Sequence, residues 1–356
     1  MPEDPRPAPR TPSWRTEAGE VVRSLGRFGP SPGPRLPLAL QAGIAMAVPV
    51  VVLSALGRDD LGLLSATGAF AVLYGGRLSA RERAAFVPLV AVALFAIAAA
   101  GVGAAFLGPV AVAFGLVAVA VGVSALCFGW SVGPPGPLFG ILVYGLSAHL
   151  ADPVAAHVDP RVYLAVVAGS LVFASVVVLA PLVRSRHRRA AARPLRALFP
   201  GARWDGAALT LLVRAAAIAV VGTVLATIVD PERAYWVVGA GIAVLGVSTS
   251  RRVTLTRGVH RAVGTAVGAG VYLALTLVPF TGIVLGLVLG LLQFAIELVV
   301  VRHYALALAF ITPLVLLILG AAGVGGPDLA VERVVDTLVG AGLGLISGLI
   351  VVRRRR

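Results

Sequence analysis

Residues 38–76 read LALQAGIAMAVPVVVLSALGRDDLGLLSATGAFAVLYGG, and residues 210–248 read TLLVRAAAIAVVGTVLATIVDPERAYWVVGAGIAVLGVS. Each stretch starts with an apolar run, passes through a turn that contains acidic residues, and ends in a shorter glycine-rich apolar run. The two stretches are offset by about 172 residues. A second match at this offset places residues 159–170 over residues 331–342, which aligns Arg161 with Arg333. The chain therefore contains an internal repeat.

The composition of the repeated unit is typical of a membrane protein. Of the 356 residues, 58% are hydrophobic and 13% are charged, and a helix needs about 20 apolar residues to cross a bilayer. Twelve apolar runs meet or approach this length, which predicts an all-α, polytopic membrane protein. The predicted spans are 37–57, 61–76, 86–107, 109–128, 137–150, 161–183, 207–229, 234–250, 262–279, 282–300, 304–321 and 333–352.

The placement of the basic residues supports twelve spans. All 30 basic residues are arginines, and 25 of them fall on one side if the twelve spans alternate in direction. Only Arg58, Arg161, Arg233 and Arg333 fall on the other side, beside most of the acidic residues outside the spans. Because positive loops stay in the cytoplasm, both termini are expected there, in a bacterial-type inner membrane. The net charge of +14 thus reflects topology, and no nucleic-acid partner is expected.

An even number of spans gives the two halves the same orientation, as a parallel repeat related by an axis along the membrane normal. A site or pore on that axis is the geometric expectation. The predicted parts are a disordered arm rich in proline and arginine (1–36), a first six-helix repeat (37–183), a basic cytoplasmic linker (184–206), a second repeat (207–352) and a basic tail (353–356).

Ionisable residues inside the predicted spans are concentrated in the second repeat. An ionised side chain at the centre of a spanning helix costs roughly 2.5–3.5 kcal/mol on insertion scales, so it needs a partner or a function. The second repeat contains Arg214, Glu297 and Asp336. Their counterparts in the first repeat are Gln41 or Ala42, then Ala125 and Leu164. Substrate contacts are therefore expected in the second repeat.

Arg214 and Glu297 are each predicted to lie roughly 8–10 Å below the cytoplasmic face, since a helix rises 1.5 Å per residue. This allows them to pair. The alternatives are that Glu297 reaches Arg302 or His303, that both side chains snorkel to the surface, or that Arg214 attracts an anion while Glu297 exchanges a proton. Gln293 lies one helical turn before Glu297 and joins the candidates for substrate binding or coupling.

Asp336 follows Arg333 by three residues, so the two can pair within one helix. A carboxylate near a helix N-terminus and a proton relay are the other interpretations. Glycines spaced by four residues at 264–268, 282–290 and 340–348 predict close helix packing. The single Cys127 has no partner for a disulfide.

Enzyme signatures are weak. The five histidines show no metal-binding spacing, and GLSAH at 145–149 lacks the second glycine of a nucleophile elbow. There is no Walker sequence. No catalytic residue, metal or cofactor is predicted, and an ion gradient is the expected source of energy for any transport.

Four segments resemble the FUSC (fusaric acid resistance protein-like) family of the aromatic acid exporter superfamily. They are PERAYWVVGAGIAVL (231–245), RGVHRAVGTAVGAG (257–270), RHYALALAFITPLVLLI (302–318) and ERVVDTLVGAGLGL (332–345). The resemblance implies an inner-membrane exporter of aromatic carboxylic acids or related organic anions, driven by the proton gradient. Plant malate channels of the same superfamily, in which six-span units dimerise around an anion pore, offer a passive channel as the alternative.

The resemblance extends to Arg257, Arg261 and Arg333 and to the aromatic residues Tyr235, Trp236 and Tyr304, without giving them roles. Many family members carry a large cytoplasmic domain between the repeats, whereas about 23 residues separate them here. The expected partners are small organic anions and the lipid bilayer, and a homo-oligomer is left open. A membrane scaffold that does not transport is the competing hypothesis, and it predicts that Arg214 and Glu297 can be replaced together by apolar residues.

Overall fold

The computed structural model describes residues 14–30, 33–153, 158–229, 233–278, 280–321 and 328–351, and within these ranges it contains helices and no strand. The first half comprises α2 (Leu36–Ala55), α3 (Asp59–Ser65) with the 3₁₀-helix η1 (Ala66–Leu73), α4 (Ala80–Leu107), α5 (Pro109–Gly129), α6 (Leu138–Leu150) and α7 (Pro160–Leu179). The second half comprises α10 (Gly206–Val229), α11 (Ala234–Leu245), α12 (Arg251–Leu275), α13 (Gly282–Val299), α14 (Tyr304–Ala321) and α15 (Leu329–Ser347). The all-α membrane class is confirmed, and each predicted span overlaps one of these segments.

The helices of the two halves make equivalent contacts. In the first half η1 packs on α2 and α7, and α4 packs on α6 and α7. In the second half α11 packs on α10 and α15, and α12 packs on α14 and α15. Between the halves, α2 packs on α13 and α10 packs on α5, so the first helix of each half meets the fourth helix of the other. This pattern is what two copies of one six-helix unit produce.

Not every helix is long enough to cross a bilayer alone. Six are long and apolar enough, namely α2, α4, α5, α7 with its 3₁₀ extension η2 (Ala180–Val183), α10 and α13. The helices α12 and α15 are also long but carry more charges, and α6, α11 and α14 are shorter. All twelve residues of α11 are buried. A half-length helix is tolerated there because the surrounding helices, rather than lipid, cover it.

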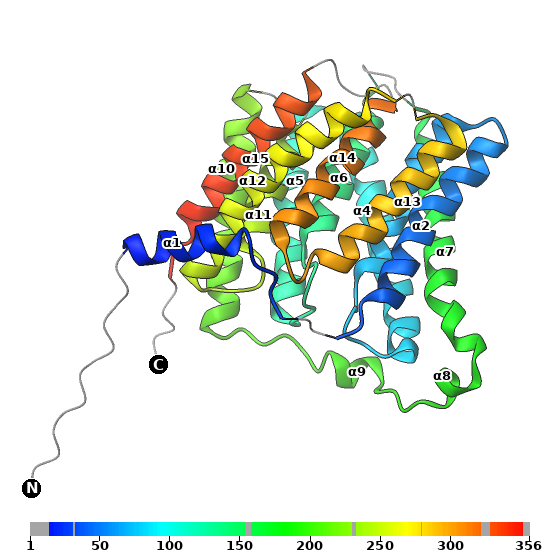
Figure 1. Cartoon of the computed structure of the whole chain (residues 1–356), viewed down its shortest axis with the longest axis horizontal. Coiled ribbons are helices and arrows are strands. Elements are labelled where there is room, and N and C mark those ends of the chain that lie inside the picture. The colour runs from blue at the N-terminus through cyan, green and yellow to red at the C-terminus, as the bar shows by residue number, and fades with distance from the viewer. Residues whose placement is uncertain are drawn as a thin grey trace, which may run out of the picture.

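The arginine-rich segments gather at one end of the molecule, called here the arginine-rich end. Figure 1 shows α1 (Trp14–Ser24), the linker helices α8 (Ser185–Arg189) and α9 (Leu195–Leu198), and the last turn of α15 toward this end. This agrees with an even number of crossings between α2 and α15.

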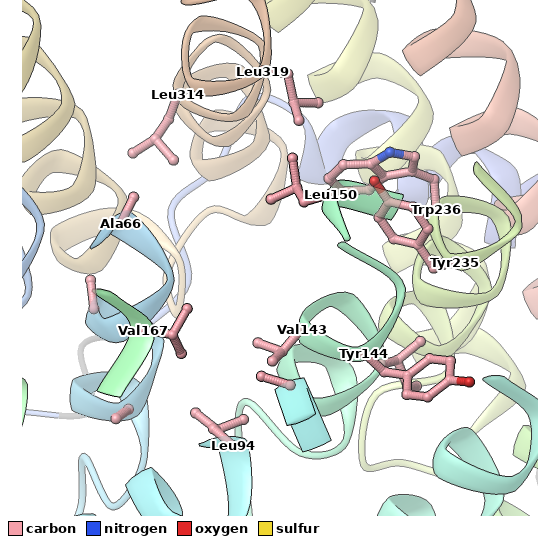
Figure 2. Packing of buried hydrophobic residues seen from close by; sticks show 14 of the residues in the cluster. Ala66, Leu94, Val143, Tyr144, Leu150, Val167, Tyr235, Trp236, Leu314 and Leu319 are labelled. Atoms are coloured by element: carbon pink, nitrogen blue, oxygen red, sulfur yellow. The ribbon is translucent and has the colours of Figure 1, made fainter. Parts of the chain in front are cut away.

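The predicted glycine packing is confirmed. A Cβ atom on Gly264 or Gly340 would collide with a backbone carbonyl of the neighbouring α14 or α11, and a Cβ atom on Gly290 would collide with Ala47 of α2. The buried apolar side chains of both halves form one hydrophobic cluster. Figure 2 shows part of this cluster, with Ala66, Leu94, Val143, Tyr144, Leu150 and Val167 from the first half and Tyr235, Trp236, Leu314 and Leu319 from the second.

The N-terminal arm differs from the prediction of a disordered segment over 1–36. Its described part contains α1, which packs on α12 with Val21 buried, and it continues to contacts with the α13–α14 turn. Sequence periodicity misses this arrangement because the helix is short and buries few apolar side chains. Residues 1–13 of the arm and the tail 353–356 lie outside the described residues.

Candidate functional site

Six buried or half-buried side chains of the second half form a group, called here the arginine–aromatic cluster. Its members are Arg257, Arg261, Arg333, Tyr235, Trp236 and Tyr304. They come from α11, α12, α14 and α15. All six side chains therefore belong to the second half, and Tyr235 also packs directly against Gly145 of α6 in the first half.

Tyr304, the first residue of α14, holds two arginines of α12. Arg257 and Arg261 are four residues apart, which places them on one face of the helix. The guanidinium carbon of Arg257 lies 4.4 Å from the centroid of the Tyr304 ring. Arg261 donates to the Tyr304 hydroxyl at 2.9 Å. Arg257 also donates to the Ala243 carbonyl at 3.1 and 2.8 Å, so it caps the C-terminal end of α11, where a positive charge is favourable.

Arg333 lies against the other end of α11. Its guanidinium carbon is 4.0 Å from the centroid of the Trp236 ring, a cation–π distance. The charge of Arg333 interacts with those of Arg261 and Asp336 and with the phenols of Tyr235 and Tyr304. A chain of cationic and aromatic groups thus follows α11 from Arg257 near its C-terminus to Arg333 near its N-terminus.

Several donors in or next to this cluster have no hydrogen-bond partner. They are Nε of Arg261, Nε and Nη1 of Arg333, and the hydroxyl of Thr337 one turn after Arg333. Arg261 is 5% exposed and Arg333 is 6% exposed. A buried donor without a partner costs about 1–3 kcal/mol, and more when it is charged. The cluster therefore contains buried positive charge that the described side chains only partly compensate.

Each guanidinium nitrogen of Arg214 donates a hydrogen bond. Arg214 is 1% exposed and donates to the carbonyls of Ile350, Gly348 and Thr249 at 2.9, 3.1 and 3.2 Å. These carbonyls belong to the end of α15 and to the turn between α11 and α12. The predicted pairing of Arg214 with Glu297 is wrong, because equal depth in the membrane does not make two helices neighbours. Arg214 instead joins α10 by hydrogen bonds to the residues that follow α15 and to the turn between α11 and α12.

Glu297 pairs with Arg35, at the start of α2. The Arg35 Nη2 to Glu297 Oε2 distance is 2.8 Å, and Arg35 Nε donates to the Glu297 carbonyl at 3.2 Å. The alternative partners Arg302 and His303 are engaged with residues 25–29 of the N-terminal arm instead. Arg83 is close enough for its charge to interact with Glu297, and it donates to Gln41 and to the Val72 carbonyl.

The remaining candidates are split between these two regions. Gln293 is buried one turn before Glu297 on α13. Asp336 is not one of the six members of the arginine–aromatic cluster, but its charge interacts with two of them, Arg333 and Tyr235. No group of three histidine, cysteine, aspartate or glutamate residues within the described ranges could hold a metal ion.

The sequence suggested a pair of Arg333 and Asp336 within one helix, but it did not bring Arg261 to them. Charge counting placed Arg333 among the residues of the acidic side, and Tyr304 and Trp236 entered only through the family resemblance. The usable signal was the contrast between the repeats. Arg161, the counterpart of Arg333, is exposed, whereas Arg333 is buried.

The comparisons with known proteins cover the same half. Residues 217–347 match the family described as fusaric acid resistance protein-like. This confirms the resemblance to the FUSC family for the segment from α10 to the end of α15, which contains the whole arginine–aromatic cluster. The chain is also 31% identical over 124 residues to the "Uncharacterized membrane protein YvaC" of Bacillus subtilis (strain 168).

That match covers 34% of this chain and 20% of the relative, so this chain spans about a fifth of the relative's length. No solved structure matches the chain significantly. Together, the apolar helices and the membrane-protein relative indicate a multi-pass membrane protein, whose residues 217–347 are similar to the fusaric acid resistance protein-like family.

Proposed function

We propose that this protein exports aromatic carboxylates or related organic anions across a bacterial-type inner membrane, with both termini in the cytoplasm and the proton gradient as the source of energy. The observation that carries the proposal is the unsatisfied hydrogen-bonding capacity of Arg261 and Arg333, which are buried among the helices of the second half. The FUSC match over 217–347 supports a transporter.

An organic anion fits the arginines chemically. A guanidinium stays charged in proteins and presents a planar fork of donors that matches a carboxylate. Arg333 keeps both Nε and Nη1 without partners, and these donors face different edges of the guanidinium. A bound carboxylate would accept a hydrogen bond from one of them and offset part of the positive charge of Arg333 and Arg261.

An aromatic substrate fits the side chains around the arginines. Trp236, Tyr235 and Tyr304 line the same cluster, and the rings of Tyr235 and Trp236 lie 4.8 Å apart. An aromatic ring next to the carboxylate could stack on these rings, and such pairs add about 0.5–1.5 kcal/mol beyond the burial of area. The arginines are nearly inaccessible, so this structure represents a closed state and transport requires α11 and its neighbours to move apart.

Asp336 is the carboxylate that we assign to proton coupling. It interacts with Arg333, so its protonation would strengthen the positive field around the anion site. Glu297 is already held by Arg35 and is assigned a structural role. Under this assignment, Asp336→Asn keeps downhill flux of the anion and loses the stimulation by a proton gradient.

The test is uptake of a labelled aromatic carboxylate such as benzoate into inside-out membrane vesicles, with and without an inside-acidic gradient. The native chain should accumulate the acid when the gradient is present. Arg333→Gln should lower uptake at least tenfold, whereas Arg161→Gln, at the exposed equivalent position of the first half, should leave it unchanged. Flux that is equal with and without the gradient would favour a passive channel, and equal uptake by both variants would remove Arg333 from the site.

A further inference from the structure

The N-terminal segment contacts His260 and His303, the residues that precede Arg261 and Tyr304 in the chain. We propose that residues 20–30, called here the cover segment, form a displaceable cytoplasmic cover that must lift before an anion reaches Arg261 from this side. The inference rests on the proposed function, because it concerns access to that site. It adds a regulated entrance that the transport proposal does not require.

The cover segment contacts the immediate chain neighbours of the two central cluster residues. The Ser24 hydroxyl lies 2.8 Å from Nε2 of His260, the residue before Arg261. The Leu25 carbonyl lies 2.8 Å from Nε2 of His303, the residue before Tyr304. His260 in turn accepts from the backbone N–H of Ala305 at 3.3 Å. The segment is thus joined to both helices that carry the Arg261–Tyr304 hydrogen bond.

The contacts continue to the turn between α13 and α14. The Phe28 ring lies 5.0 Å from the His303 ring and 5.4 Å from the guanidinium carbon of Arg302. The backbone N–H of Gly29 donates to the Arg302 carbonyl at 2.7 Å, and Arg302 Nε donates back to the Gly29 carbonyl at 3.3 Å. These partners are more than 270 residues away in sequence, so the segment is docked by tertiary contacts.

The contacts of the cover segment are few, so the segment can detach and bind again. Glu20 pairs with Arg252, but these side chains are 38% and 62% exposed, and exposed ion pairs contribute little. Val21 is buried at 4% exposure, whereas Val22 beside it is 64% exposed. In the described part of the segment, one buried apolar side chain and a few hydrogen bonds replace the broad apolar contact that fixes a core helix. Segments with few buried apolar contacts open at lower free energy than the core.

Movement of the cover segment can be followed with a thiol at Val21. The full-length chain would carry Cys127→Ala, since Cys127 is the single native cysteine, together with Val21→Cys. Labelling by a membrane-impermeant maleimide is measured in inside-out vesicles, at rest and with benzoate and an inside-acidic gradient. The matched control is Val22→Cys, which is already exposed. We expect slow labelling of Val21→Cys at rest, at least fivefold faster labelling during transport, and fast labelling of Val22→Cys in both conditions.

A second variant, Phe28→Ala, weakens the docking without touching the cluster. It should accelerate Val21→Cys labelling at least fivefold at rest and raise the initial rate of benzoate uptake. Labelling that stays slow during transport, or uptake that is unchanged when Phe28→Ala releases the segment, would overturn the cover. If the native chain takes up no aromatic acid, the proposed function fails. The cover is then tested by whether Phe28→Ala also speeds thiol labelling of Tyr304→Cys, and an unchanged rate rejects it.

Discussion

Arg333 of α15 lies with its guanidinium carbon 4.0 Å from the centroid of the Trp236 ring of α11, and two of its nitrogen atoms are buried without a hydrogen-bond partner. The ring provides attraction from one face, whereas the N–H groups of Nε and Nη1 are left for acceptors. The same residue in the first half, Arg161, is exposed. The two repeats therefore differ in structure at this position.

Replacing Trp236 should change which acids are preferred. Trp236→Leu keeps an apolar side chain but removes the ring that faces Arg333. An aromatic pair contributes about 0.5–1.5 kcal/mol beyond the burial of area, so the preference for benzoate over an aliphatic acid of similar size should fall by about 2- to 13-fold. The measurement is competition for uptake between the two acids. An unchanged preference would mean that Trp236 does not contact the substrate.

Arg214 should matter for stability and not for recognition. Arg214→Met keeps much of the side chain and leaves three buried carbonyls without their donor. We expect a loss of about 3 kcal/mol or more in the free energy of unfolding, since hydrogen bonds from charged groups contribute about 1.5–3 kcal/mol each. Thermal unfolding in detergent, compared with Arg161→Met, measures this loss. Normal stability combined with lost uptake would return Arg214 to the transport site.

Glu297 and Arg35 should behave as a coupled structural pair. Glu297→Gln and Arg35→Gln should each lower the unfolding temperature, and the double variant should lose less free energy than the two single losses added together, because contacting residues couple by about 0.5–3 kcal/mol. Gradient-driven uptake should survive in Glu297→Gln. A stable Glu297→Gln protein that has lost gradient dependence would instead make Glu297 the coupling residue.

The approach of α15 to α11 depends on Gly340. A Cβ atom there would collide with the Val237 carbonyl, whereas a Cβ atom on Gly342 would meet nothing within 4 Å. Gly340→Ala should therefore destabilise the protein by roughly 1–3 kcal/mol. Gly342→Ala should be neutral or stabilising by up to about 1 kcal/mol, because alanine favours the helix. Equal unfolding temperatures for the two variants would show that α15 does not pack as described.

The sequence predicts the helices well but predicts their neighbours poorly. Apolar runs and arginine placement locate α5, α10 and α13 to within a few residues, because burial in lipid imposes a length and a composition. The depth of a residue along a span gives its position along the membrane normal, but it does not show which helix lies beside it. It therefore suggested a partner for Glu297 on α10, whereas the structure places Arg35 beside it.

The arginine–aromatic cluster could be predicted only in part for the same reason. Arg257 and Arg261 share a helical face, which spacing alone indicates. Their meeting with Tyr304, and that of Arg333 with Trp236, depends on how α11 inserts among α12, α14 and α15. That arrangement is fixed by glycine contacts such as Gly264 on Ala305, whose partners a single sequence does not reveal.

The most direct test of the anion site is equilibrium binding of labelled benzoate to the purified, detergent-solubilised full-length protein. The native protein and Arg161→Gln should bind with the same affinity, and Arg333→Gln should bind at least tenfold more weakly while unfolding at a similar temperature. Equal affinity in the native protein and Arg333→Gln would contradict the account, because the unpartnered donors of Arg333 would then not hold the anion.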